Sequence, residues 1–276
     1  MHVESSPSPG LSPGELFADA YLSDPEKAEV RFDFTITDAF QPGKDRPRLT
    51  ARNLFKKQPV RGAVDDAVLC WYETRSGAAD PETGLREDAF RFGVAAHTLR
   101  PITAWVQLPE ELTEHPASLA AFIDHRLMVR LGTAENRALT RDIVDHQDVA
   151  TLPYSGSYAA GLLAAFDEIE QTGGTGHAIM VNPRDYYEEL VGSGSLLADL
   201  AREQVMICRH RQVAPGRAVV GDFAMAARLL DAEASVIRIA EPPAGTFDRP
   251  GTAVCAQIHE RVAVQQPTHF FHIAPA

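Results

Sequence analysis

Cysteine, lysine and long apolar runs are all scarce in this sequence, and each scarcity excludes a class of protein. The chain of 276 residues has three widely separated cysteines, Cys70, Cys208 and Cys255. An odd and dispersed set forms neither a disulfide framework nor a CxxC pair, which indicates a reducing compartment. No apolar run approaches the roughly 20 residues that a membrane helix needs. The acidic, Pro/Ser-rich start is not that of a signal peptide. We therefore expect a cytoplasmic protein with no membrane partner.

Basic residues are also fewer than acidic residues. Lysine and arginine total 26 against 38 aspartates and glutamates, a net charge of −12. Such an acidic balance discourages non-specific contact with nucleic acid. Nearly all the basic residues are arginines, which has two interpretations: a GC-rich genome, or a preference for the planar guanidinium at interfaces. The hydrophobic share of 45% is ordinary for a globular protein, and the length suits one large domain or two connected ones.

The sequence also lacks the common catalytic motifs. It contains no GxSxG nucleophile elbow and no GxxxxGK[ST] phosphate loop. Two glycine-rich stretches, GTGH at 174–177 and GSGS at 192–195, do not have the Rossmann spacing and are interpreted as loops. His269 and His272 are expected on a strand, where a spacing of three places them on opposite faces. We therefore predict no catalytic, cofactor-binding or metal-binding residue and no cofactor.

One cysteine leaves an enzyme hypothesis open. Cys208 lies in a CRHR run with His210 two residues on, and nearby cationic groups lower a thiol pKa. The alternative is a small apolar residue in a strand beside solvated charges. The enzyme hypothesis predicts an activity that Cys208→Ala abolishes.

The first quarter of the chain shows little periodicity. Residues 1–14 are rich in Pro and Ser and are expected to be a disordered tail. Residues 15–66 are expected to form an extended arm with one or two short strands, one of them in the alternating run 30–36. A hairpin follows, with strands at 67–73 and from 90 onward, the second continuing to Leu108. The polar connection between them is unusually long for a compact domain.

Helices and strands then alternate irregularly. A long amphipathic helix is predicted over 117–142, with Leu119, Ile123, Leu127 and Leu131 recurring every fourth residue. A second helix is predicted over 157–171 and ends at two glycines. Asn182 is expected to cap a helix that has Pro183 at its first position. The remaining predicted elements are a short helix at 223–230 and strands at 177–181, 205–208, 218–220, 236–239, 253–264 and 270–273. This order indicates an α+β fold.

Five segments resemble, in order, the tailed-phage major capsid and encapsulin family. SLAAFIDHRLMVRLGTAENRALT resembles the spine helix, and PITAWVQLPEEL before it resembles the strand that leaves the extended loop (E-loop). GHAIMVNPRDYYEEL is similar to the strand, Asn-Pro and helix of the axial domain. APGRAVVGDFAMAARLLDAEASVIRIAE carries the Gly-Asp-Phe that follows a buried strand, and CAQIHERVAVQQPTHFFHI resembles the closing strands.

The resemblance implies a phage major capsid-like α+β fold with an N-arm, an extended E-loop hairpin, a peripheral domain with a long spine helix, and an axial domain. The implied division is a tail at 1–14, N-arm at 15–66, E-loop at 67–98, peripheral domain at 99–150, axial domain at 151–235, and strands returning to the peripheral domain at 236–276. It also implies that the E-loop residues Arg75, Asp80, Glu82 and Arg86 contact a neighbouring copy. A possible pore loop is implied at Gly192, Ser193, Gly194 and Ser195, for which an ordinary surface turn is an equal alternative.

Two kinds of shell share this fold, and the resemblance leaves both open. An encapsulin nanocompartment encloses cargo enzymes, whereas a phage capsid packages DNA. We favour the encapsulin because the chain reaches the arm within about 15 residues, without a helical scaffolding segment, although a phage with a separate scaffold protein would look the same. One feature argues against it: the N-terminal helix that holds cargo peptide in well-known encapsulins is not evident. The expected partners are further copies of the chain and a cargo protein, with nucleic acid only for a phage capsid.

Overall fold

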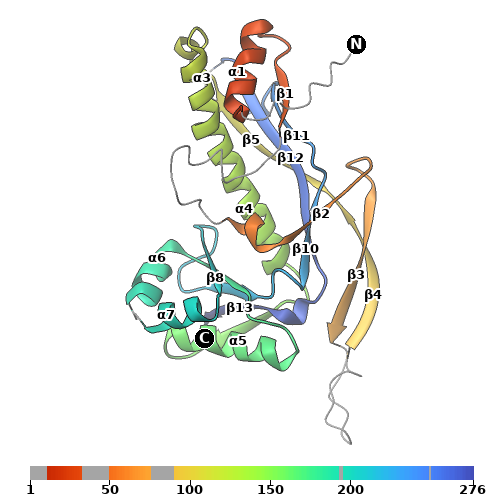
Figure 1. The fold of residues 1–276 in the computed structure, drawn as a ribbon, viewed down its shortest axis with the longest axis vertical. Helices are drawn as coiled ribbons and strands as arrows, with labels where there is room; N and C mark the ends of the chain where they lie inside the picture. Colours follow the sequence, from red (N-terminus) through yellow and green to blue (C-terminus); the bar gives the residue numbers. More distant parts are fainter. Residues whose placement is uncertain (1–10, 33–49, 76–89, 193–194, 249) are drawn as a thin grey trace, which may run out of the picture. The chain divides into compact units, whose positions relative to one another are not determined.

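The computed structural model describes residues 11–32, 50–75, 90–192, 195–248 and 250–276 (Figure 1). The chain divides into two compact units, each built from three stretches of sequence. Unit 1 consists of Met1–Arg48, Arg100–Glu135 and Asp231–Glu260, and unit 2 of Leu49–Leu99, Asn136–Leu230 and Arg261–Ala276. Helices and strands are mixed along the chain, so the α+β class is confirmed.

Unit 1 begins with a helix where an extended arm was expected. Helix α1 (Pro13–Ser23) starts at Ser12, whose hydroxyl accepts from the Glu15 backbone N–H, while the Glu15 carboxylate accepts from the Ser12 N–H. This capping box supplies hydrogen-bond acceptors for N–H groups at the start of the helix. Pro13, in the first turn, has no N–H group that would need an acceptor. The predictions of a tail to residue 14 and of an extended arm from residue 15 are therefore wrong for this segment; residues 1–10 lie outside the described part.

The long helix is confirmed, but it contains an interruption. Helix α3 (Pro116–Phe122) passes through a π-helical turn, η4 (Ile123–Leu127), into helix α4 (Met128–Val144). Leu119, Ile123, Leu127 and Leu131 are all fully buried. A spacing of four residues drifts about 40° per step around a 3.6-residue helix. The wider π turn offsets this drift and keeps the stripe on one side.

The sheet of unit 1 is antiparallel. Strand β12 (Ala253–Val264) pairs through its first half with β11 (Ser235–Ile239) on one side and β5 (Arg100–Gln107) on the other, and β11 pairs with β1 (Glu29–Phe32). Alternate residues of β5 are buried, among them Ile102, Ala104 and Val106, as the alternation predicted. The run predicted as one strand to Leu108 is two strands, because β4 ends at Thr98 before β5 begins.

Unit 2 contains a five-stranded mixed sheet in the order β6-β13-β9-β7-β8. β13 is parallel to β6 and β7 is parallel to β8, whereas β9 is antiparallel to both of its neighbours. One face packs against helices through a cluster that includes Leu162, Ile169, Ile179 and Leu190. The strands are β6 (Ala150–Tyr154), β7 (Ala178–Val181), β8 (Met206–Arg209), β9 (Ala218–Gly221) and β13 (Phe270–Pro275), and the helices are α5 (Tyr158–Gln171), α6 (Pro183–Asp185), the π-helical η5 (Tyr186–Val191) and α7 (Ser195–Arg202).

Strand β13 departs from the expected division. Residues 236–276 were predicted to return together to the peripheral domain, but β13 pairs with β9 and β6 in the sheet of unit 2, while β11 lies in unit 1. Sequence order alone does not show which strands become neighbours. The other domain boundaries remain predictions.

The helix predicted at 223–230 is also wrong. After one turn, in which the Met225 N–H donates to Asp222, the chain becomes strand β10 (Ala227–Asp231), which pairs with β2 (Lys56–Pro59). A short apolar run fits a buried helix and a buried strand equally well. The remaining elements are the two-stranded β3 (Ala67–Arg75) and β4 (Phe90–Thr98) and the 3-10 turns η1 (Ala51–Leu54), η3 (Glu110–Leu112) and η6 (Pro267–His269).

None of the helices in the described residues is long and apolar enough to span a membrane.

Candidate assembly surfaces

The β3–β4 hairpin presents an uncovered apolar face. The two strands form their own antiparallel sheet, with Trp71 opposite Val94 and Leu69 opposite Ala96, and are drawn as a long ribbon in Figure 1. Directly opposed residues share a face. On this face Leu69 is 71%, Trp71 45%, Phe92 74% and Val94 66% exposed. Contiguous apolar side chains left in water mark a surface that another protein covers.

The opposite face of the hairpin packs within unit 2. Cys70 is buried, which raises the pKa of its thiol, and the Tyr72 ring lies over Gly93, where a Cβ would come within 2.6 Å of it. The Glu73 N–H donates to the Gln265 carbonyl at 2.7 Å, and Arg261 donates to the Thr98 carbonyl. An isolated two-stranded hairpin is only marginally stable in water. These contacts therefore stabilise the hairpin against the rest of unit 2, while its other face stays exposed.

The E-loop residues predicted from the resemblance are largely beyond the described part of the chain. Arg75 is the last residue of β3, where its backbone pairs with that of Phe90. Asp80, Glu82 and Arg86 fall in 76–89, outside the described residues. Their role in contacts between copies remains a prediction.

One carboxylate binds the start of helix α1 to the long helix, in addition to the buried side chains of α1. Asp124, in the π turn, accepts from the Ser12 hydroxyl at 2.5 Å and from the Gly14 N–H at 2.7 Å. Negative charge at a helix N-terminus is favourable because the first N–H groups point toward it. Gly14 permits the close approach, because a Cβ there would overlap the carbonyl oxygen of Ala120.

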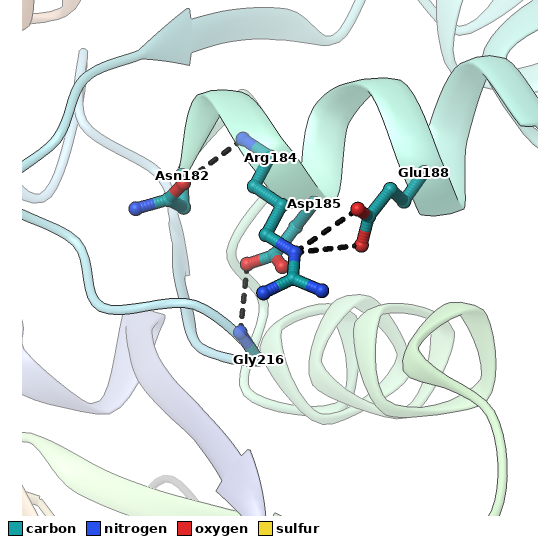
Figure 2. A network of polar contacts seen from close by, with 5 residues as sticks. All are labelled: Asn182, Arg184, Asp185, Glu188 and Gly216. Carbon is teal, nitrogen blue, oxygen red and sulfur yellow. Dashed lines mark hydrogen bonds and ion pairs between the residues drawn. The ribbon is translucent and has the colours of Figure 1, made fainter.

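A second polar network fixes the segment after β7. The Asn182 side chain caps the helix by accepting from the Arg184 N–H at 2.9 Å and also donates to the Val213 carbonyl at 2.7 Å, so the predicted cap is confirmed. Figure 2 shows the Asp185 carboxylate facing Gly216 and Arg184 lying along the helix toward Glu188. The Gly216 N–H donates to Asp185 at 2.8 Å. Burial raises the pKa of Asp185, and the hydrogen bond from Gly216 opposes that shift.

This network also fixes a turn. The Arg217 N–H donates to the Ala214 carbonyl, with Pro215 between them and Gly216 at a φ of +74°. Proline followed by a glycine of positive φ is the pattern of a type II turn. The Tyr154 hydroxyl donates to the Gly216 carbonyl from the other side. The hydrogen bonds of Gly216 with Asp185 and with Tyr154 thereby connect the turn to helix α6 and to strand β6.

An aromatic and cationic cluster lies beside that network. The Arg209 guanidinium stands 4.5 Å from the centre of the Tyr186 ring and 5.9 Å from that of Tyr187, and it donates to the Tyr187 hydroxyl at 3.1 Å. The two rings meet edge to face. Tyr187 is 60% exposed and Val191, one turn on, 44%. We call Tyr186, Tyr187, Val191 and Arg209 the Tyr–Arg cluster; the sequence analysis did not bring these residues together.

The predicted pore loop is only partly a loop. Gly192 has helical backbone angles at the end of η5, and Ser195 opens helix α7. Ser193 and Gly194 lie outside the described residues. The amphipathic sequence on both sides of this stretch favours helix. The glycines and serines of residues 192–195 led to the prediction of a loop instead. A role in a pore remains a prediction.

A groove of about 400 Å³ runs between α5 and α7. Its walls are apolar and include Leu163, Phe166, Leu196 and Leu200. Leu163 is 55% exposed, whereas Leu196 and Leu200 are buried. The groove is the second feature that sequence reasoning missed, because α7 itself was not predicted.

The cysteine hypothesis finds no support in the geometry. Cys208 is fully buried in the apolar core of unit 2, and His210 is 3% exposed, with its Nε2 3.0 Å from the Thr140 hydroxyl. A thiol enclosed by apolar side chains is reached neither by water nor by substrate. His269 is buried in η6, where its Nε2 lies 3.3 Å from the Thr172 carbonyl. Among the described residues no three His, Cys, Asp or Glu side chains gather to hold a metal.

The Gly-Asp-Phe sequence is structural. At Gly221 a Cβ would overlap the Phe270 ring. Asp222 accepts from the Met225 N–H, and Phe223 packs edge to face on Phe55 and Phe270. This motif therefore fills the core of unit 2 and performs no chemistry at a surface.

Comparison with known proteins places the fold. No protein-family model and no curated protein sequence matches the chain. Solved structures do: a virus-like particle from Pyrococcus furiosus has a TM-score of 0.58 at 10% identity, covering 82% of this chain and 92% of that one. A chain from Mycobacterium phage Ogopogo has 0.54 at 14% identity (84% and 94%). The capsid of a native GTA particle has 0.51 at 12% identity (86% and 93%). The chain has the fold of these particle-forming proteins, which confirms the predicted capsid-like fold.

Proposed function

We propose that this chain is a structural subunit that self-assembles into a closed icosahedral shell and performs no catalysis. The observation that carries the proposal is the hairpin. In a chain with a capsid-like fold, it leaves four large apolar side chains exposed on one face. We infer that a second copy of the chain covers them, because repeated heterologous contacts whose rotation closes generate rings and shells.

Within this class we infer an encapsulin nanocompartment that encloses a cargo enzyme in the cytoplasm. The support is helix α1, docked on α3 through Asp124 and Gly14. A helix at this place is the element that holds cargo peptide in well-known encapsulins, and its apparent absence was the main feature against this assignment. Leu11 and Leu22, 45% and 46% exposed beside and on α1, offer apolar surface to such a peptide.

The alternative is the major capsid protein of a tailed phage or prophage, enclosing DNA. It is supported by the fold likeness to a chain from a mycobacterial phage and to a GTA capsid. The two shells are distinguished by their contents, not by the wall.

Electron microscopy and analytical ultracentrifugation of the full chain, expressed alone, test the shell. We expect megadalton particles; monomers and dimers only, at high protein concentration, would contradict it. Particles purified from the native host then separate the two assignments, since protein contents support the nanocompartment and nuclease-protected DNA supports the phage capsid.

A further inference from the structure

The groove between α5 and α7 carries negative charge along its apolar walls. Glu170 at the end of α5, Asp199 in α7 and Glu203 just after α7 all line it. Asp199 is paired with Arg202, 3.1 Å away, so the carboxylates of Glu170 and Glu203 set the excess charge. The matching occupant is a bulky apolar or aromatic side chain accompanied by a cation.

The Tyr–Arg cluster has this chemistry. Tyr187 is a largely exposed aromatic ring, Val191 adds aliphatic surface, and Arg209 holds its guanidinium against both tyrosines. Tyrosine and arginine are enriched among the residues that dominate binding energy at interfaces. Because Arg209 is already stacked and hydrogen-bonded to the Tyr187 hydroxyl, little side-chain freedom is lost when it binds.

The acidic end of the groove, at Glu170 and Glu203, and the Arg209 guanidinium lie at opposite ends of the same strands. Thr175 and Gly176 of the groove precede β7, and Val205 precedes β8. The cluster lies at the other ends, because Tyr186 and Tyr187 follow β7 and Arg209 ends the parallel β8. Each strand has four residues, which separates Arg209 from the acidic end of the groove by roughly 10 Å or more at about 3.3 Å per residue. Arg209 therefore does not pair with Glu170 and Glu203 of its own chain and is free to meet those of a neighbouring copy.

We propose that the Tyr–Arg cluster of one copy docks in the α5–α7 groove of the next, forming a head-to-tail contact between unit 2 of neighbouring subunits. Two different, complementary patches on one chain are what a heterologous interface needs, and repetition around an axis closes a ring. The inference rests on the proposed shell function and names the contact that builds its rings, separately from the hairpin.

Charge reversal on each side tests the contact. Glu170→Arg with Glu203→Arg reverses the groove, and Arg209→Glu reverses the cluster. Because opposed like charges disfavour association, we expect each to lower particle yield roughly tenfold or more. All three changes in one chain restore attraction and are expected to recover particles. The control is Glu168→Arg, an exposed residue of α5 that does not line the groove, with wild-type yield expected.

Circular dichroism and thermal unfolding establish that each variant is folded. Leu163→Ser, at an exposed wall position, provides a test without charge reversal and is expected to reduce assembly. Wild-type yield from both reversed variants, or no recovery in the combined variant, would overturn the docking proposal while the shell stands. If the unmodified chain forms no particles, the proposed function fails and the docking proposal with it.

Discussion

Two residues far apart in sequence decide where helix α1 lies. Asp124 accepts from Ser12, 112 positions away, and from the Gly14 N–H, while the missing side chain of Gly14 lets α1 approach the backbone at Ala120. The carboxylate adds charge-assisted hydrogen bonds at a helix N-terminus, which are stronger than neutral ones. The docking of α1 is therefore sensitive to single substitutions at either partner.

Gly14→Ala tests the close approach. The added methyl group would overlap the Ala120 carbonyl oxygen, so α1 must shift, at a cost of about 1–3 kcal/mol typical of overpacking. We expect faster hydrogen exchange in α1 and α3. Asp19→Ala, at an exposed position of the same helix, is the control and should leave exchange unchanged; equal protection in both variants would contradict the role of Gly14.

Asp124 also predicts a pH dependence. Burial raises the pKa of this carboxyl above its usual 3.8, and the hydrogen bonds from Ser12 and Gly14 oppose the shift; the charge of Glu15 adds to it and that of His125 reduces it. Because the folded pKa exceeds the unfolded one, the folded state binds the proton more tightly. The group's contribution to stability is full below about 3.8 and is lost as the pH rises through the folded pKa.

Asp124→Asn removes this titration while keeping an acceptor for the Gly14 N–H. Relative to the wild type, the variant should therefore gain stability as the pH rises from below 3.8 through the raised pKa of the folded Asp124 carboxyl. Urea unfolding midpoints of the two proteins across this range measure the difference. A difference that stays constant, or that falls with rising pH, would show that burial of the charge is not what shifts the pKa.

At the scale of elements, the hairpin is the part of the chain least satisfied by its own fold. One face packs on unit 2 through Cys70, and the other leaves Leu69, Trp71, Phe92 and Val94 in water. The described part of each strand has a single strand neighbour. Exposed apolar strands of this kind are aggregation hazards unless a specific partner covers them.

Phe92→Ser with Val94→Ser tests the exposed face. Both side chains are already in water in the single chain, so unfolding free energy should change by no more than about 0.5 kcal/mol per site, whereas particle formation should be lost. Arg91→Ser, on the other face of the same strand, is the control and should assemble. Particle yield by sedimentation is the measurement; full assembly of the double variant would remove the hairpin from the interface.

Elements that are specified by residues close together in the sequence, such as a helix cap or a hydrophobic stripe, were predictable, and the other elements were not. The cap at Asn182 and the buried stripe of the long helix each depend on neighbours within a few residues, and both are confirmed. Helix α1 was missed although its capping box was present, because prolines and serines around Ser12 suggested a tail. Residues 223–230 were assigned to a helix because periodicity does not distinguish short buried runs.

At the scale of the whole molecule, the chain joins a capsid-like fold to three surfaces that suit contact with other chains. We propose that the hairpin face and the Tyr–Arg cluster with its groove contact further copies of the chain, and that the surface of α1 contacts a cargo peptide. Its net charge of −12 discourages non-specific binding to nucleic acid, so the proposed assembly depends on specific apolar and paired-charge contacts.

The sequence by itself determined the fold class, most of the strands and the long helix, because hydrophobic periodicity and turn chemistry are local properties of the chain. Only the tertiary structure decided that β13 joins the sheet of unit 2, that Asp124 anchors α1, and that α5 and α7 enclose an acidic groove. Each of these depends on residues distant in sequence becoming neighbours in space, which no local pattern specifies.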